Sequence, residues 1–72
     1  MNKFHKRLRT LRVEKGLTQQ ELGKLLNLSR TAVGDWETTS KEPNIDNLMK
    51  LADIFNVTLD ELCGRDNSSF LD

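Results

Sequence analysis

TQQELGKLLNLSRTAVGDWE, residues 18–37, holds the signals for two short helices joined by a tight turn. Thr18 and Glu21 have the spacing of a capping box, in which a hydroxyl and a carboxylate bond free N–H groups at a helix start. Asn27 belongs to the non-glycine residue type that best tolerates a positive φ, so the first helix is predicted to end there. Ser29 is the candidate cap of the second helix, which we expect to reach the end of this stretch.

Apolar residues in this stretch recur at intervals of three and four, which is the helical period. The residues expected to face the core are Leu22, Leu25, Leu26, Ala32, Val33 and Trp36. The residues expected to face outward from the second helix are Arg30, Thr31, Gly34 and Asp35. Gly23 lies where the two helices must approach each other closely. Although any small bundle could share some of these features, together they meet the requirements of a helix-turn-helix.

The flanking sequence extends the helical pattern over the whole chain. Helices are predicted over about residues 2–15 and 45–55, with a last short one between Thr58 and Gly64. Their expected apolar residues are Phe4, Leu8, Leu11, Ile45, Leu48, Leu51, Ala52, Phe55, Leu59 and Leu62. Gly16 ends the first of these helices, and Asn44 is the expected cap of the fourth. The sequence therefore predicts an all-α chain, a compact bundle of five short helices over residues 1–65, followed by a polar tail over 66–72.

Length and composition limit this chain to one small domain. It has 72 residues, of which 36% are apolar, so its core is thin and a large enclosed enzyme cleft is not expected. Its single cysteine, Cys63, and single histidine, His5, supply neither an internal disulfide nor a zinc-binding set. No nucleophile, base and orienting group are suggested together, and no phosphate-binding glycine loop occurs. We expect no enzyme activity, no cofactor and no metal.

The formal net charge is zero, but the charges are unevenly distributed. The first 36 residues hold eight basic and three acidic side chains, and the other half holds three basic and eight acidic ones. Such asymmetry suggests that one end meets an anionic partner, although a solvated basic helix face would look the same. No apolar run approaches the roughly 20 residues of a membrane-spanning helix, and no signal peptide is evident, so we expect a cytoplasmic protein.

From Leu8 to Gly64 the chain resembles the lambda-repressor-like, Cro-type helix-turn-helix regulators, also called the xenobiotic-response-element family. The segments that carry the resemblance are LRTLRVEKGLTQQELGKLLNLSRTAVGDWE and EPNIDNLMKLADIFNVTLDELCG. The resemblance implies a bacterial or phage-encoded, sequence-specific transcriptional regulator, most often a repressor. It also implies that Arg12 pairs with Glu37. The departures from the family pattern are Gly23 for alanine, Asn27 for glycine, Gly34 for a larger polar residue, and Thr38-Thr39-Ser40 for a loop richer in glycine and lysine.

In such a scaffold the third helix enters the major groove and presents its outward side chains to base edges. Arg30 can donate two parallel hydrogen bonds to a guanine, and Thr31 can meet a thymine methyl group or a phosphate. Asp35 could accept a hydrogen bond from a cytosine amino group, hold Arg30 in place, or face water. Candidate phosphate contacts, either at the start of the second and third helices or in the following loop, are Gln19, Ser29, Thr38, Thr39, Ser40 and Lys41.

A single copy offers little contact area, so we expect a homodimer on a two-fold operator with half-sites roughly 34 Å apart. The fourth and fifth helices are the expected dimer surface. A second interpretation is a protein-interaction module, such as an antitoxin or antirepressor-type partner, that binds another protein through the acidic half or the tail around Phe70 and Leu71. Trp36 is expected in the core rather than as a base-stacking platform, and Cys63 as a small apolar residue rather than a redox-sensing thiol.

Overall fold

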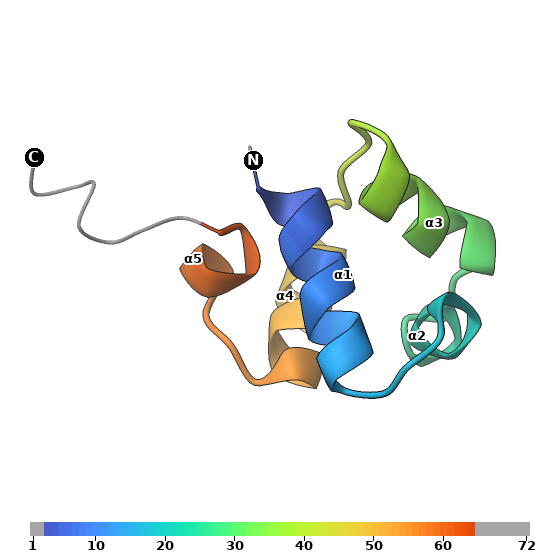
Figure 1. The fold of residues 1–72 in the computed structure, drawn as a ribbon, viewed down its shortest axis with the longest axis horizontal. Coiled ribbons are helices and arrows are strands. Elements are labelled where there is room, and N and C mark those ends of the chain that lie inside the picture. Colours follow the sequence, from blue (N-terminus) through green and yellow to red (C-terminus); the bar gives the residue numbers. More distant parts are fainter. Residues whose placement is uncertain (1–2, 65–72) are drawn as a thin grey trace, which may run out of the picture.

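The structure, a computed structural model, describes residues 3–64. In chain order the helices are α1 (Phe4–Glu14), α2 (Gln19–Leu25), α3 (Arg30–Thr38), α4 (Ile45–Phe55) and α5 (Leu59–Leu62). Figure 1 shows α1 in the middle of the molecule, with α2 and α3 on one side and α5 on the other. The predicted all-α bundle of five short helices is confirmed within this range. The predicted domain end at residue 65 and the tail over 66–72 lie outside the described residues.

The helix boundaries are set by short-range hydrogen bonds that the sequence predicts. Thr18 and Glu21 form the complete capping box that opens α2, with Thr18 Oγ1 accepting from the Glu21 N–H at 3.0 Å. The side chains that cap α3, α4 and α5 are Ser29, Asn44 and Thr58. The residues with positive φ that follow the helices are Gly16, Asn27, Asn56 and Gly64. Of these, only Asn56, with φ of 55°, was not anticipated from the sequence.

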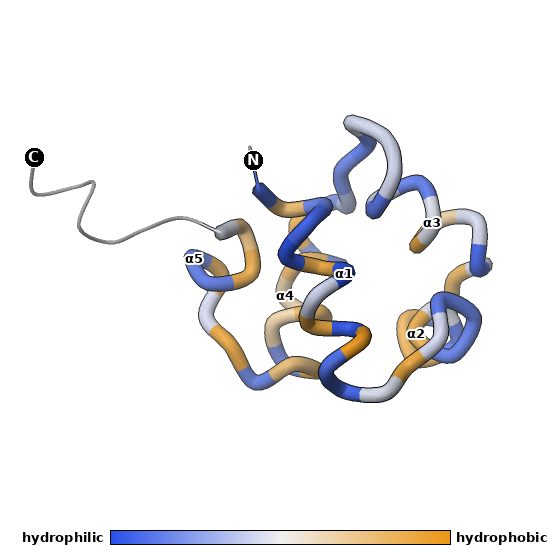
Figure 2. Tube along the Cα trace, viewed as in Figure 1, coloured by the Kyte–Doolittle hydropathy of each residue, from blue (hydrophilic) through white to orange (hydrophobic). Residues whose placement is uncertain are grey.

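One hydrophobic core joins the five helices. Its buried residues are Phe4, Leu8, Leu11, Leu22, Leu26, Val33, Trp36, Leu48, Leu51, Ala52, Phe55 and Leu62. Hydrophobic and hydrophilic residues alternate along the helices in Figure 2, as expected when each helix buries only one face. The expected core position of Trp36 is confirmed.

Two expectations about burial, those for Leu25 and Ala32, were wrong or too strong. Leu25 is 58% exposed, whereas Leu22, Gly23 and Leu26 are buried. These three residues lie within about 100° of one another around α2, and Leu25 falls outside that arc. Exposed residues also include Ile45 and Leu59, at the first positions of α4 and α5, and Ala32 is only partly buried.

The angle between α2 and α3 is fixed by a close approach at Gly23. A Cβ atom at this position would lie 2.9 Å from the Leu28 carbonyl oxygen and 3.0 Å from that of Ser29. The Leu28 N–H also donates to the Gly23 carbonyl at 2.8 Å. The predicted need for a small residue here is confirmed, because a side chain at this position would meet the backbone of the turn.

Candidate nucleic-acid interface

A buried polar network ties α1, the start of α2 and the end of α3 together. The Arg12 guanidinium donates to both carboxylate oxygens of Glu37, from Nε at 2.6 Å and from Nη2 at 3.0 Å. Arg12 Nη1 also donates to the Leu17 carbonyl at 2.8 Å, and Gln19 Nε2 donates to Glu37 Oε1 at 3.2 Å. Only 2% of the Glu37 side chain is exposed, and 12% of that of Arg12. Glu37 raises the pKa of Arg12, chiefly through this hydrogen bond, so the guanidinium stays charged despite its burial.

This network confirms the pairing of Arg12 with Glu37 that the family resemblance implied. The network also includes Gln19, which the sequence suggested as a phosphate contact at the start of α2. One N–H of its amide is committed to Glu37, and its oxygen lies on the Gly34 side of α3, 3.5 Å from where a Cβ at Gly34 would be. Gln19 is partly buried. An amide nitrogen carries two N–H groups, so the second N–H of Gln19 remains available for donation.

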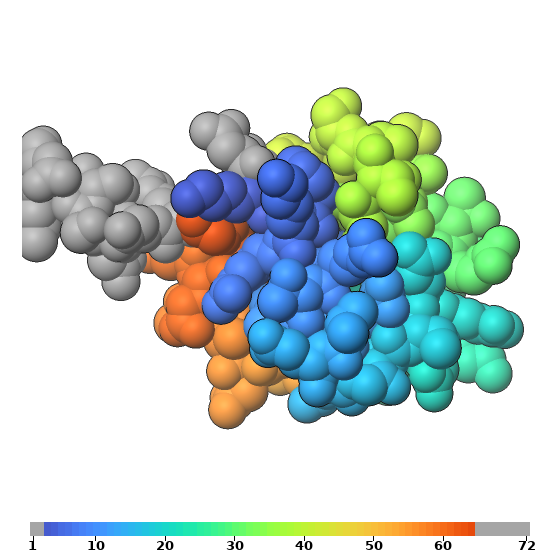
Figure 3. Space-filling model, viewed as in Figure 1, coloured from blue at the N-terminus to red at the C-terminus, as the bar shows by residue number. Residues whose placement is uncertain are grey.

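The first turn of α3 presents Arg30 and Thr31 to solvent. Figure 3 shows the side chains of α2 and α3 side by side along one edge of the molecule. Ser29 precedes Arg30 and caps the helix, with its Oγ accepting from the Ala32 N–H at 3.3 Å, so its hydroxyl proton is still available for donation. Asp35, one turn farther along, is partly buried. This edge combines donors with an exposed arginine, as a groove-reading surface requires.

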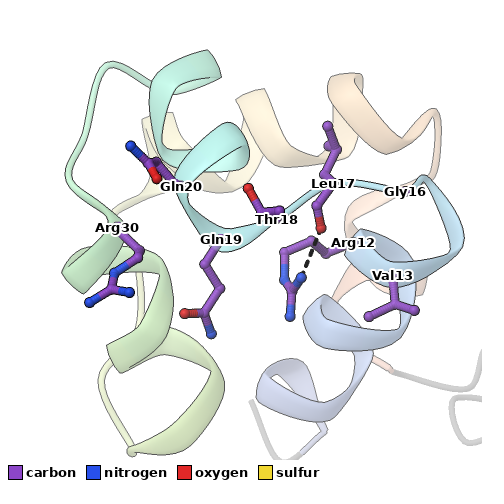
Figure 4. A pocket seen from close by; sticks show the side chains of 8 residues that line it. All are labelled: Arg12, Val13, Gly16, Leu17, Thr18, Gln19, Gln20 and Arg30. Atoms are coloured by element: carbon purple, nitrogen blue, oxygen red, sulfur yellow. Dashed lines mark hydrogen bonds between the residues drawn. The ribbon is translucent and has the colours of Figure 1, made fainter.

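An open hollow of about 600 Å³ lies between the end of α1 and the starts of α2 and α3. Figure 4 shows the side chains of Gln19 and Arg30 reaching into the same space. Gln20, which was not among the predicted site residues, also lines this hollow and is exposed. Its only sequence signal is its place beside Gln19 in the first turn of α2.

Side-chain hydrogen bonds hold the last turn of α3 and the first loop residue after it. Thr38 Oγ1 donates to the Gly34 carbonyl at 2.7 Å, and Thr39 Oγ1 donates to the Asp35 carbonyl at 2.6 Å. These two hydroxyl protons are therefore already used, and donation to a phosphate would require breaking an existing bond. Lys41 Nζ lies 3.5 Å from Asp35 Oδ2. Ser40 is exposed beside them.

Asp35 therefore has Lys41 as its ionic partner. The sequence alone is compatible with three roles for this carboxylate, namely a base contact, an interaction with Arg30, and exposure to water. The pair with Lys41 was not among them, because a loop residue six positions away cannot be placed by helical periodicity.

Two properties of the described residues bear on other kinds of site. Within residues 3–64, no three His, Cys, Asp or Glu side chains gather to hold a metal ion. In the same range no helix has the length and apolar character needed to cross a membrane.

Comparisons with known proteins agree with the helix-turn-helix geometry. A family model described as Helix-turn-helix matches residues 8–62. The HTH-type transcriptional activator BcrR of Enterococcus faecalis is 42% identical over 59 residues, which are 82% of this chain and 29% of that protein. The chain spans about half the length of other curated regulators that it matches.

Two solved structures have the same fold at substantial sequence identity. The P22 c2 repressor, in complex with a synthetic operator, superimposes with a TM-score of 0.80 at 32% identity, covering 88% of this chain and 96% of that one. The restriction-modification controller protein C.AhdI from Aeromonas hydrophila superimposes with a TM-score of 0.73 at 40% identity, covering 83% of this chain and 87% of that one.

Proposed function

The chain belongs to the helix-turn-helix family, whose family model matches residues 8–62, and we propose that it is a transcriptional regulator. In this proposal it binds double-stranded DNA sequence-specifically and acts as a repressor. One observation carries the proposal: α2 and α3, which approach each other closely at Gly23, expose Arg30 and Thr31 on the first turn of α3. A helix has the width of the major groove, so these side chains would meet base edges. The P22 c2 repressor, whose structure is a complex with a synthetic operator, supports the proposal that this fold binds DNA.

Arg30 is the proposed main base-reading residue. Its fork of donors matches the O6 and N7 acceptors of guanine, a pairing worth roughly 1 to 3 kcal/mol of discrimination. Thr31 is proposed to contact a thymine methyl group or a phosphate beside it. Asp35 is proposed to face the groove as an acceptor for a cytosine amino group.

Phosphate contacts are proposed on both sides of α3. Before it, the free N–H of the Gln19 amide and the hydroxyl of Ser29 are available donors. After it, Ser40 is exposed on the loop, whereas Thr38 and Thr39 would first have to release backbone carbonyls. Such contacts position the protein on the duplex without reading its sequence.

We propose that two copies bind a two-fold operator, in the cytoplasm of a bacterium, with α4 and α5 forming the dimer surface. Ile45 and Met49, one turn apart on α4, are 62% and 54% exposed, and Leu59 on α5 is 40% exposed. Burying such apolar surface between copies would favour association. The alternative of a protein-interaction module drew partly on Phe70 and Leu71, which lie outside the described residues.

Selection of bound duplexes from a random DNA pool tests the function. The wild-type protein is expected to enrich one motif, and Arg30→Ala is expected to lose the preference at one base pair of each half-site. Lys6→Ala is the matched control, because it removes one exposed cation from α1, which is neither the proposed reading helix nor part of the proposed dimer surface, and it is expected to keep the motif. Equal affinity of the wild-type protein for every duplex would refute sequence-specific regulation. A stoichiometric co-purifying protein without salt-dependent DNA binding would favour the interaction module.

A further inference from the structure

The proposed base-reading residues Arg30, Thr31 and Asp35 form what we call the reading face of α3. Asp35 is its one acidic side chain, and this negative charge opposes binding to DNA, which is a polyanion. Asp35 is partly buried, and 35% of its side chain is exposed. Duplex DNA carries one negative charge per roughly 1.7 Å of axis, so a carboxylate on this helix would be repelled by phosphates on both sides of the groove. The only ion pair described for this carboxylate within residues 3–64 is with Lys41, at 3.5 Å.

The backbone holds Lys41 next to Asp35. Thr39 Oγ1 donates to the Asp35 carbonyl at 2.6 Å and accepts from the Lys41 N–H at 3.1 Å. The Thr39 N–H donates to the same carbonyl at 2.9 Å. Thr39 thus links the last turn of α3 to the loop. Because its bonds hold the Lys41 backbone near Asp35, the lysine side chain can reach the Asp35 carboxylate.

We propose that Lys41 is the counter-charge of Asp35, so that the two residues approach DNA as one neutral unit. Lys41 is then a positioning residue for the reading face instead of an independent phosphate contact. Neutralised in this way, Asp35 can enter the groove as a hydrogen-bond acceptor. Without Lys41, the same carboxylate would weaken binding to any duplex. This inference rests on the proposed DNA-binding function.

A double-mutant cycle on DNA affinity tests the coupling. The proteins are the wild type, Lys41→Met, Asp35→Asn and the double variant, and the ligand is the duplex selected by the wild type. In the wild-type background Lys41→Met is expected to weaken binding about tenfold, because it leaves a bare carboxylate near phosphates. In the Asp35→Asn background the same change is expected to weaken binding by less than about twofold, since no carboxylate remains to be neutralised.

Salt dependence separates the two roles of Lys41. A phosphate contact contributes about 0.9 to the slope of log affinity against log salt for B-DNA. We expect Lys41→Met to leave this slope unchanged when Asp35 is already asparagine. The control is Lys6→Met, whose small effect is expected to be equal in both backgrounds because Lys6 is an exposed residue of α1, outside both α3 and the proposed dimer surface.

Several outcomes would overturn the inference. Equal losses in both backgrounds, with the slope reduced by about 0.9 in each, would make Lys41 an independent phosphate contact. No loss in either background would exclude any role in binding. Circular dichroism melting of the four proteins without DNA checks that both changes leave the fold intact. If the wild type bound no duplex, the proposed function itself would fail, whereas an additive cycle on a bound duplex rejects only the role of Lys41.

Discussion

Replacing Glu37 with alanine removes the centre of the network that joins α1, α2 and α3. The carboxylate accepts two hydrogen bonds from Arg12 and one from Gln19, and its side chain is 2% exposed. After Glu37→Ala the Arg12 guanidinium, itself 12% exposed, keeps only its bond to the Leu17 carbonyl. Removing one partner of a buried ion pair costs about 3 to 5 kcal/mol, because the other charge is left without compensation.

That cost is comparable to the whole stability of the domain. A single core in a chain of this length supplies roughly 3 to 5 kcal/mol of net stability, so Glu37→Ala is expected to be largely unfolded at room temperature. Arg12→Met is expected to be similarly damaging, since it leaves the buried Glu37 carboxylate unpaired. The double variant Arg12→Met/Glu37→Leu has no unpaired charge and is expected to lie within about 1 kcal/mol of the wild type.

Urea unfolding followed by far-UV circular dichroism measures these differences. Lys41→Met is a matched control, because it breaks an ion pair whose side chains are 72% and 35% exposed, for which about 0 to 1 kcal/mol is expected. A loss of less than about 1 kcal/mol for Glu37→Ala would mean that the buried pair behaves like an exposed one. A double variant as unstable as the sum of the singles would equally refute the reasoning.

Two further changes test the backbone and the caps. Gly34→Ala is expected to raise the free energy of unfolding by about 0.5 to 1 kcal/mol, because helix propensity improves and the new Cβ would meet neighbours no closer than 3.5 Å. Gly23→Ala is expected to lack this gain in the same urea titration, since its Cβ would lie 2.9 Å from the Leu28 carbonyl oxygen. Bonds from the Thr18 N–H and hydroxyl lower the pKa of Glu21 below its ordinary value of 4.5, so its stabilisation is complete above that pH and is lost as pH falls through the lowered pKa. The stability difference between wild type and Glu21→Gln is therefore expected to shrink in acid, and a constant difference from neutral pH downward would contradict this.

Sequence reasoning was most successful where one residue type and its near neighbours decide the structure. A positive φ at Asn27 and at Gly16 follows from residue type and position at a helix end. Asn56 takes the same conformation, and its signal was available, because it is an asparagine directly after the last apolar residue of α4. Apolar spacing predicted the end of this helix at residue 55, but it does not indicate the positive φ of the residue that follows.

The candidate site was predictable in part. Exposure of Arg30 and Thr31 follows from helical periodicity, because the core face of α3 is marked by Val33 and Trp36. The hydrogen bond from Gln19 to Glu37 was not predictable in this way, since the two residues are 18 positions apart and no local rule relates them. The same holds for the pairing of Asp35 with Lys41 across the loop.

The order of residues by itself determined five helices, their ends and the outward direction of Arg30, because capping and periodicity act over only a few positions. Tertiary structure alone decided that Leu26 rather than Leu25 enters the core, since burial depends on where a neighbouring helix comes to lie. It also decided how far Gln19 can reach toward a phosphate. That property depends on a carboxylate brought close by folding, and distances across a fold are set by the packing of all the helices together.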